Sequence, residues 1–182
     1  LAGADCISVP AKEFGHDLAA MAAAITPETR IVFVANPNNP TGTRASNDAV
    51  KDLVNNVPDE VLLVMDEAYF EFIDDAPDLL PLISKKQNLM VMRTFSKIHG
   101  LAGLRVGYGI GHPDFVAALE KIRQPFNLNA MAQAAALAAL EDDEHVQSTR
   151  KNNAEGLHFF ENAFSDMGIE TVPSHANFIL AK

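Results

Sequence analysis

Three short runs of apolar residues mark the chain, and polar residues follow each run. The runs are RIVFVAN, ending at Asn36, VLLVMDE, ending near Asp66, and NLMVMRT, ending at Thr94. Each is almost continuous in valine, isoleucine, leucine, methionine and phenylalanine. Such runs are typical of strands that are buried on both faces, as in a parallel sheet covered by helices. The pattern therefore predicts an α/β fold with a mostly parallel sheet.

Segments with helical spacing lie between and after these runs. After the first run, Ser46 is a suitable N-cap, and four apolar residues share one face of the helix that follows: Ala49, Val50, Leu53 and Val54. Strand, helix and strand together predict a βαβ unit. Further on, HPDFVAALEKIRQ predicts a helix with Pro113 in its first turn, and NAMAQAAALAALE predicts a helix that is mostly buried.

The last part of the chain predicts a long helix and two strands. The helical pattern runs from about Asp142 to Met167, and Gly168 is placed to end it. IETVP and NFILAK then have the composition of strands. We predict that residues 1–140 form part of a large domain and that residues 141–182 form a linker helix and the start of a smaller domain. Because both ends of the sequence are abrupt, we expect a piece of a longer protein.

The composition of the 182 residues argues against several classes of function. With 48% hydrophobic and 21% charged residues the chain is typical of a globular protein, and its net charge of -10, with no basic stripe, argues against nucleic-acid binding. No apolar stretch is long enough to span a membrane, and no signal peptide is visible. Cys6 is the single cysteine, which excludes an internal disulfide and fits a reducing, cytoplasmic compartment; we expect it to be a small core residue. The six histidines have no ligand spacing, so we expect no metal site.

Polar side chains gather where the three predicted strands end. In chain order they are the loop NPNNPTGT from Asn36 to Thr43, then Asp66 and Tyr69, then Thr94, Ser96 and Lys97. In open α/β sheets, ligands bind beyond the carboxyl ends of the strands. We therefore expect the three clusters to meet in one cleft.

Each cluster also has an explanation without function. NPNNPTG suits a tight turn, Asp66 a helix cap or a surface pair, and Lys97 and Arg105 a solvated surface. VLLVMDE resembles the acidic strand of a P-loop ATPase, but the chain has no GxxxxGK[ST] motif, and GYGIG is not a GxGxxG loop. His99 is expected behind the site or at the surface rather than in catalysis.

The order and spacing of these residues together favour a functional site. The segments NPNNPTG, DEAY and SKIHGLAGLRVGY carry Asn39, Asp66, Tyr69, Lys97 and Arg105 in that order. In this the chain resembles the large domain of pyridoxal-phosphate-dependent aminotransferases of the aspartate aminotransferase type, class I/II and fold-type I. The stretches RQPFN and SHANFILAK are most similar to the histidinol-phosphate aminotransferase branch.

The resemblance implies that the cofactor is pyridoxal 5′-phosphate and that Lys97 forms the Schiff base with its aldehyde. Nearby positive charge and partial burial lower the pKa of an amine nucleophile, which agrees with this role. Once substrate displaces it, the Lys97 amine can carry the proton between the substrate α-carbon and the cofactor C4′. Asp66 would face the pyridine nitrogen and keep it protonated, so that the ring accepts electrons.

The remaining site residues hold the cofactor in this resemblance. Tyr69 and Asn39 would hydrogen-bond its phenolic oxygen, and Thr94, Ser96 and Arg105 would bind its phosphate, to which hydroxyls and a guanidinium are suited. The Asn39–Pro40 peptide is expected to be cis, since the loop must turn sharply and related aminotransferases have a cis proline there. The family's ring-stacking aromatic residue would precede residue 1, and its carboxylate-binding arginine would follow residue 182.

The reaction implied is transfer of an amino group from histidinol phosphate to 2-oxoglutarate, in histidine biosynthesis, by a cytoplasmic homodimer. More broadly, the donor is an amino-acid or amino-alcohol phosphate and the acceptor a 2-oxo acid. Two alternatives stay open: a decarboxylase of an amino-acid phosphate, and a regulator that only senses the cofactor. Arg123 and Asn127 could recognise a polar substrate group, but a helix–loop junction explains them equally.

Overall fold

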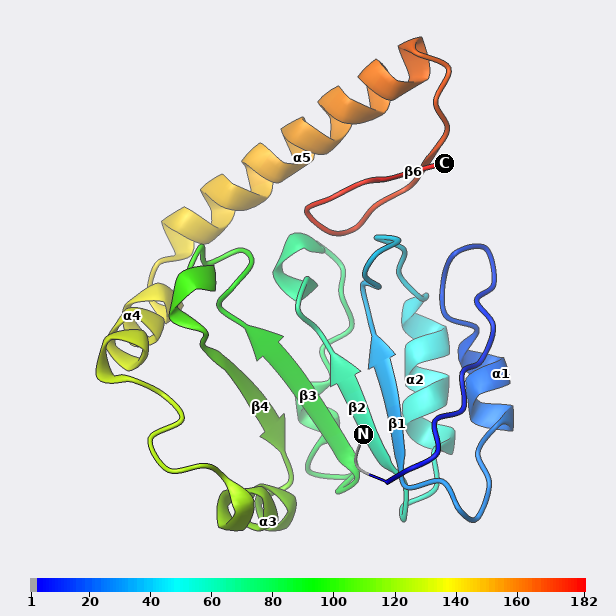
Figure 1. Cartoon of the computed structure of the whole chain (residues 1–182), viewed down its shortest axis with the longest axis vertical. Coiled ribbons are helices and arrows are strands. Elements are labelled where there is room, and N and C mark those ends of the chain that lie inside the picture. Colours follow the sequence, from blue (N-terminus) through cyan, green and yellow to red (C-terminus); the bar gives the residue numbers. More distant parts are fainter. Residues whose placement is uncertain (1–2) are drawn as a thin grey trace.

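A four-stranded sheet forms the centre of the structure, a computed structural model that describes residues 3–182 (Figure 1). Its strands lie side by side in chain order: β1 (Ile31–Ala35), β2 (Leu62–Asp66), β3 (Leu89–Thr94) and β4 (Gly107–Gly111). β1, β2 and β3 are parallel, and β4 is antiparallel to β3. The three strands predicted from the apolar runs are confirmed. Because they are parallel, all three end at the same edge of the sheet.

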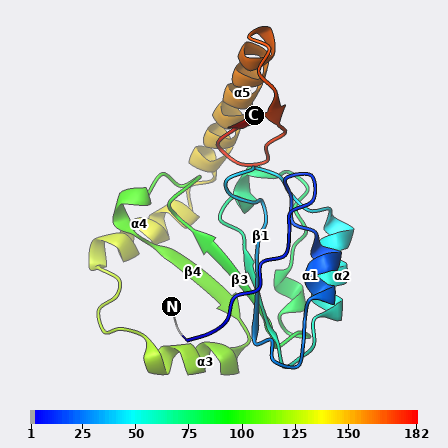
Figure 2. The ribbon, with the colours of Figure 1, turned by 45° about the vertical axis from the view of Figure 1, so that its right-hand side comes forward.

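One face of the sheet packs against two helices, α1 (Leu18–Ala23) and α2 (Asn47–Asn56), which lie together on that side in Figure 2. Successive side chains of a strand point to opposite faces, so alternate residues enter this core. They are Val32 and Val34 of β1, Leu63 and Met65 of β2, and Leu89 and Val91 of β3, against Val50, Leu53 and Val54 of α2. The Ser46 hydroxyl accepts a hydrogen bond from the backbone N–H of Ala49, so the predicted N-cap is confirmed.

The other face of the sheet is open at β1. Ile31 and Phe33 are 48% and 65% exposed, and Met92 of β3 is 38% exposed, whereas Val64 of β2 is buried. The prediction that these strands are buried on both faces is therefore wrong for β1. The reason is that α1 and α2, the two helices beside β1, both pack on the opposite face.

Two further helices follow β4: α3 (Pro113–Ile122), which begins at the predicted proline, and α4 (Ala130–Leu140). α4 buries only Ala132 and Ala136, which pack with Phe95 and Val106. Its largest apolar side chains are exposed, namely Met131, Leu137 and Leu140. The prediction that this helix is mostly buried is wrong, because only its alanine side faces the rest of the described chain.

The helix α5 (Asp143–Asp166) has 24 residues and extends away from the sheet (Figure 1). Near its beginning, His145 Nε2 lies 3.1 Å from the carbonyl oxygen of Ile98, and the Arg150 guanidinium donates to the carbonyl of Glu71 at 2.8 Å. Gly168, with φ of +71°, follows the helix as predicted. The strands β5 (Thr171–Val172) and β6 (Leu180–Ala181) then pair antiparallel, each only two residues long.

Short 3-10 helices occupy several connections. They are η1 (Phe70–Phe72), η2 (Leu80–Leu82) and η3 (Ala102–Leu104). η1 directly follows Tyr69, and η3 lies between Lys97 and Arg105. The segments that bear the predicted site residues therefore leave the sheet as compact turns.

Two elements and one residue depart from what the sequence predicts. β4 has the sequence GYGIG, and its glycines allow close approach to β3: a Cβ atom on Gly107 would lie 2.9 Å from the Arg93 carbonyl oxygen. α1 is only six residues long and gives a weak helical pattern. Cys6 is exposed, and residues 3–10 form no strand, so the predicted core position of Cys6 is wrong.

Candidate functional site

Three strand ends bring the predicted site together at one edge of the sheet. Backbone hydrogen bonds tie them: Asn36 donates to the Asp66 carbonyl at 2.9 Å, and Glu67 donates to the Met92 carbonyl at 2.8 Å. In the strand register Asp66 lies between Ala35 of β1 and Met92 of β3. Side chains from three distant parts of the sequence therefore lie next to one another.

Asn39, Tyr69 and Lys97 form the first group. The Asn39 side-chain amide donates a hydrogen bond to the Tyr69 hydroxyl at 3.0 Å. The Lys97 ammonium lies 5.2 Å from the centre of the Tyr69 ring, within the range of a cation–π interaction. The amine of Lys97, the phenol of Tyr69 and the amide of Asn39 thus lie close together, although Lys97 is 58 positions after Asn39 in the sequence.

The loop NPNNPTG presents Asn39 through a tightly defined turn. The Asn39–Pro40 peptide is cis, as predicted, and the Asn36–Pro37 peptide is cis as well. Gly42 has φ of +73°, which favours glycine, and a side chain there would collide with Ser174. The carbonyl of Gly42 also accepts a hydrogen bond from His175 at 2.8 Å. The loop is therefore held both by the sheet and by the last part of the chain.

Asp66 is the last residue of β2 and is partly buried. Its Oδ1 atom accepts a hydrogen bond from the backbone N–H of Ala68 at 3.0 Å. This bond turns the chain at the end of the strand, and three residues after Asp66 the ring of Tyr69 is buried. The carboxylate is held by its own turn and forms no ion pair in the described part of the chain.

Thr94, Ser96 and Arg105 form the second group. The Thr94 hydroxyl accepts from the Ser96 backbone N–H at 3.1 Å, and the Arg105 guanidinium donates to the Ser96 hydroxyl at 3.4 Å. A second bond from Arg105 to the Ala102 carbonyl, 2.8 Å long, fixes the guanidinium. Arg105 itself is left-handed, with φ of +54°, at the end of η3. Two hydroxyls and a guanidinium are groups that can donate hydrogen bonds to a phosphate.

Sequence reasoning missed three residues that pack around this site. Glu67 and Arg93, each directly next to a predicted site residue, form a salt bridge with a 2.9 Å separation. The aromatic ring of Phe178, from the C-terminal segment, meets the Tyr69 ring edge to face at 5.3 Å. For the salt bridge, the sequence offers one signal: a charged residue directly beside an apolar run in both DEAY and VMRT. No sequence pattern pairs Phe178 with Tyr69.

The other residues singled out from the sequence lie elsewhere. Arg123 is exposed and donates to the Asn127 side chain at 3.0 Å and to Glu120 at 2.8 Å, which is the arrangement of an ordinary helix–loop junction. His99 packs against Phe95, and burial, with His145 nearby, lowers its pKa. Within residues 3–182, no group of three potential ligand side chains could hold a metal ion.

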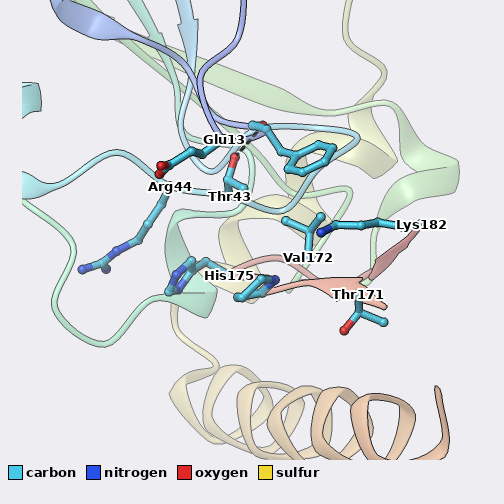
Figure 3. A pocket seen from close by; sticks show the side chains of 9 residues that line it. Glu13, Thr43, Arg44, Thr171, Val172, His175 and Lys182 are labelled. Carbon is cyan, nitrogen blue, oxygen red and sulfur yellow. Dashed lines mark hydrogen bonds between the residues drawn. The ribbon is translucent and has the colours of Figure 1, made fainter. Parts of the chain in front are cut away.

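A hollow of about 280 Å³ lies apart from these strand ends, between the loops at residues 13–14 and 43–44 and the segment of β5 and β6 (Figure 3). Arg44, His175 and Lys182 line it, but none of the predicted site residues does. The Arg44 guanidinium is already engaged by Asp75, and Lys182 by Glu170. The convergent donors and the Lys97 amine lie at the strand ends instead.

Comparisons with known proteins identify the family and the fold of the chain. The family model described as Aminotransferase class I and II matches residues 1–182, so the chain belongs to that family. Aspartate aminotransferase from Thermus thermophilus shares its fold, with a TM-score of 0.81 and 23% identity over 93% of this chain and 46% of that one. The fold-class prediction, the large domain of a fold-type I enzyme with a mostly parallel sheet, is therefore confirmed.

Nearer relatives narrow the similarity within the family. The chain is 53% identical to a histidinol-phosphate aminotransferase of Akkermansia muciniphila and 52% identical to histidinol-phosphate aminotransferase 2 of Ralstonia nicotianae, covering 50% and 49% of their lengths. The histidinol-phosphate aminotransferase of Sinorhizobium meliloti, solved in complex with pyridoxal-5′-phosphate, has a TM-score of 0.90 and 35% identity over 95% of this chain and 48% of that one. The chain thus spans about half the length of the relatives it matches.

Proposed function

We propose that the intact protein is a histidinol-phosphate aminotransferase that depends on pyridoxal 5′-phosphate. It would transfer the amino group of histidinol phosphate to 2-oxoglutarate, giving imidazole acetol phosphate and glutamate, in histidine biosynthesis. The observation that carries the proposal is the contact set of Asn39, Tyr69 and Lys97 at the same sheet edge as Asp66 and Arg105. Relatives at 53% and 52% identity, both called histidinol-phosphate aminotransferases, support it.

The side chains at this edge fit the cofactor by their chemistry. Thr94, Ser96 and Arg105 would hold its phosphate, since their hydroxyls and guanidinium already gather around one point. Asn39 and Tyr69 would donate to its phenolic oxygen. When bound, the cofactor supplies a carbonyl that an amine can attack and a ring that accepts electrons.

The chain's own residues supply binding, orientation and proton transfer. Lys97 Nζ lies over the Tyr69 ring, where its amine would be the nucleophile and would later carry the proton taken from the substrate α-carbon. The Asp66 carboxylate, fixed by the Ala68 N–H, would hold a proton on the pyridine nitrogen. The Asn39 amide orients the Tyr69 hydroxyl, so that this phenol keeps one direction.

The deciding experiment is a screen of amino donors with the intact protein, pyridoxal 5′-phosphate and 2-oxoglutarate. Glutamate should form fastest with histidinol phosphate. L-threonine-O-3-phosphate decarboxylase from Porphyromonas gingivalis is also similar, at 26% identity and a TM-score of 0.73. Release of carbon dioxide from an amino-acid phosphate would favour that alternative, and cofactor binding without turnover would favour a regulator that only senses the cofactor.

Three further parts of the proposal concern the whole protein. We propose a homodimer, division into a large domain through residue 140 and a smaller one after it, and a cytoplasmic location. The exposed apolar residues of β1 and α4 support further contacts in the intact protein. Within the described residues no helix is long and apolar enough to cross a membrane. Light scattering, limited proteolysis near residue 140 and cell fractionation test the three parts separately.

A further inference from the structure

Glu67 is the most deeply buried charged residue in the described part of the chain. Only 3% of it is exposed, and it follows Asp66 directly. Its Oε2 atom accepts a hydrogen bond of 2.9 Å from Arg93 Nε and also lies 2.9 Å from a terminal nitrogen of the same guanidinium, as an ion pair. The Arg93 guanidinium in turn lies 3.8 Å from the centre of the Phe70 ring. Arg93 thus contacts both Glu67 and Phe70, and these contacts connect the end of β3 with the segment that follows β2.

The position of this pair sets it apart from the other ion pairs of residues 3–182. The regular pairing of β2 with β3 ends at Asp66 and Met92. One residue further, the side chains of Glu67 and Arg93 continue the connection, just after the end of β2 and while β3 still pairs with β4. Arg93 is adjacent to Thr94, so the pair joins the immediate neighbours of two residues assigned to the cofactor.

The pair lies close in sequence to Tyr69 and Lys97, so it can influence the distance between these two side chains. Tyr69 follows Glu67 by two residues, and Lys97 follows Arg93 by four. The Lys97 amine lies 5.2 Å from the Tyr69 ring, and no hydrogen bond between the two side chains fixes that separation. The Glu67–Arg93 pair is the nearest direct side-chain bond between the two segments. A shift of about 1 Å in such a site can reduce activity on the order of a hundredfold.

We propose that Glu67 and Arg93 are positioning residues, whose buried ion pair sets the distance between the strand end that carries Asp66 and Tyr69 and the strand end that carries Thr94 and Lys97. The proposal rests on the proposed function only in its second part, the effect of the pair on cofactor binding. The geometric part concerns the cofactor-free protein. If the pair only stabilised the fold, its removal would increase amide exchange throughout the protein instead of at these two strand ends.

Amide hydrogen exchange of the intact, cofactor-free protein tests the geometric part. At pH 8, where Glu67 is ionised, E67Q should increase exchange in the peptides that contain residues 66–70 and 94–97. The control V50A removes buried apolar volume on α2, in the core between α2 and the sheet, and should lower the stability of the fold without increasing exchange selectively there. Equal exchange in E67Q and wild type at both strand ends, or the same pattern in V50A, overturns the proposal.

Pyridoxal 5′-phosphate affinity tests the consequence. E67Q and R93K should each weaken binding by about tenfold to a hundredfold, while D75N, which removes the charge from an exposed pair with Arg44, should leave it near the wild-type value. Raised exchange with unchanged affinity also overturns the proposal. If E67Q does not fold, R93K supplies both measurements. A wild type that binds no pyridoxal 5′-phosphate contradicts the proposed function, and the exchange experiment still decides the role of the pair.

Discussion

The side-chain amide of Asn39 donates a hydrogen bond to the Tyr69 hydroxyl at 3.0 Å, from the loop after β1 to the turn after β2. The Tyr69 side chain is buried, whereas Asn39 is exposed. Because the bond joins two segments that the backbone ladder does not hold together beyond the strand ends, we expect it to fix the Tyr69 ring under Lys97. The effect of this hydrogen bond can therefore be measured both on the stability of the fold and on the cofactor site.

A double-mutant cycle on this bond should show coupling. Y69F and N39A each remove one partner, and their coupling free energy in urea unfolding of the cofactor-free protein should be about 1 kcal/mol. In the intact enzyme Y69F should reduce turnover only mildly and should shift the pH at which the bound cofactor changes absorbance. Strictly additive effects of the two substitutions would contradict the contact.

The lysine assignment is tested by covalent labelling. Borohydride reduction of the protein with bound pyridoxal 5′-phosphate should fix the pyridoxyl mass on the peptide that contains Lys97, which lies over the Tyr69 ring. K97A should lose turnover and keep some bound cofactor through the phosphate contacts. Label on Lys85 or Lys86 instead would show that the assignment is wrong.

The charge of Asp66 is tested by its amide. D66N keeps an oxygen that can accept the Ala68 N–H, so the turn and the melting temperature should change little. Turnover in the intact enzyme should fall by about 10²–10³-fold, because a fixed charge at the reacting system is lost. A near-normal rate in D66N would remove Asp66 from the catalytic set.

Arg105 can be tested with a cofactor that lacks the phosphate. R105A should weaken binding of pyridoxal 5′-phosphate by about tenfold to a hundredfold, as expected for loss of hydrogen bonds to a charged group. Binding of pyridoxal, which has no phosphate, should be unchanged. If both affinities fall together, Arg105 acts on the fold of η3, whose first residue, Ala102, it also contacts through the carbonyl, rather than on the phosphate.

The ionisation of Glu67 predicts a pH dependence of stability. Burial raises the pKa of its carboxyl from 4.5 to about 7, and Arg93 opposes the shift only in part. The folded state therefore binds more protons than the unfolded state between these values, so this residue's contribution is complete below pH 4.5 and is lost as pH rises through 7. The loss amounts to about 3 kcal/mol at most.

Comparison of wild type with E67Q isolates this contribution. The difference in unfolding free energy between the two proteins should change between pH 4.5 and 7 and level off on both sides. Arg93 keeps its charge throughout, because its ordinary pKa lies far above this pH range; burial lowers that pKa, and Glu67, Tyr108 and Glu71 together raise it above the ordinary value. Parallel curves for the two proteins across this range would show that Glu67 is ionised in the fold at all these pH values.

The sequence predicts the parts of this structure that depend on local pattern. The apolar runs ending at Asn36, Asp66 and Thr94 define the parallel strands, and Ser46, Pro113 and Gly168 mark helix ends correctly. These features follow from residue spacing and backbone preference alone. The Asn39–Tyr69 contact could be expected because parallel strands end at one edge.

Other features depend on contacts that the sequence does not order. GYGIG has poor strand propensity, and β4 exists because β3 offers it hydrogen-bonding partners. The exposure of Phe33 depends on which side α1 and α2 choose, which an apolar run cannot indicate. The Glu67–Arg93 pair requires the register of β2 against β3: the sequence shows a charged residue beside each apolar run, but not that the two charges face each other.

The long helix α5 connects the segment that carries Lys97 with the C-terminal strands. At 24 residues it is about 36 Å long. Its first turn touches the segment that carries Lys97, through His145 and the carbonyl of Ile98, while its far end leads into β5. A tilt of roughly 10° about the first turn moves the far end by about 6 Å. Any such tilt would therefore strain the contacts of His175 with Gly42 and of Phe178 with Tyr69, which hold the C-terminal segment against the site.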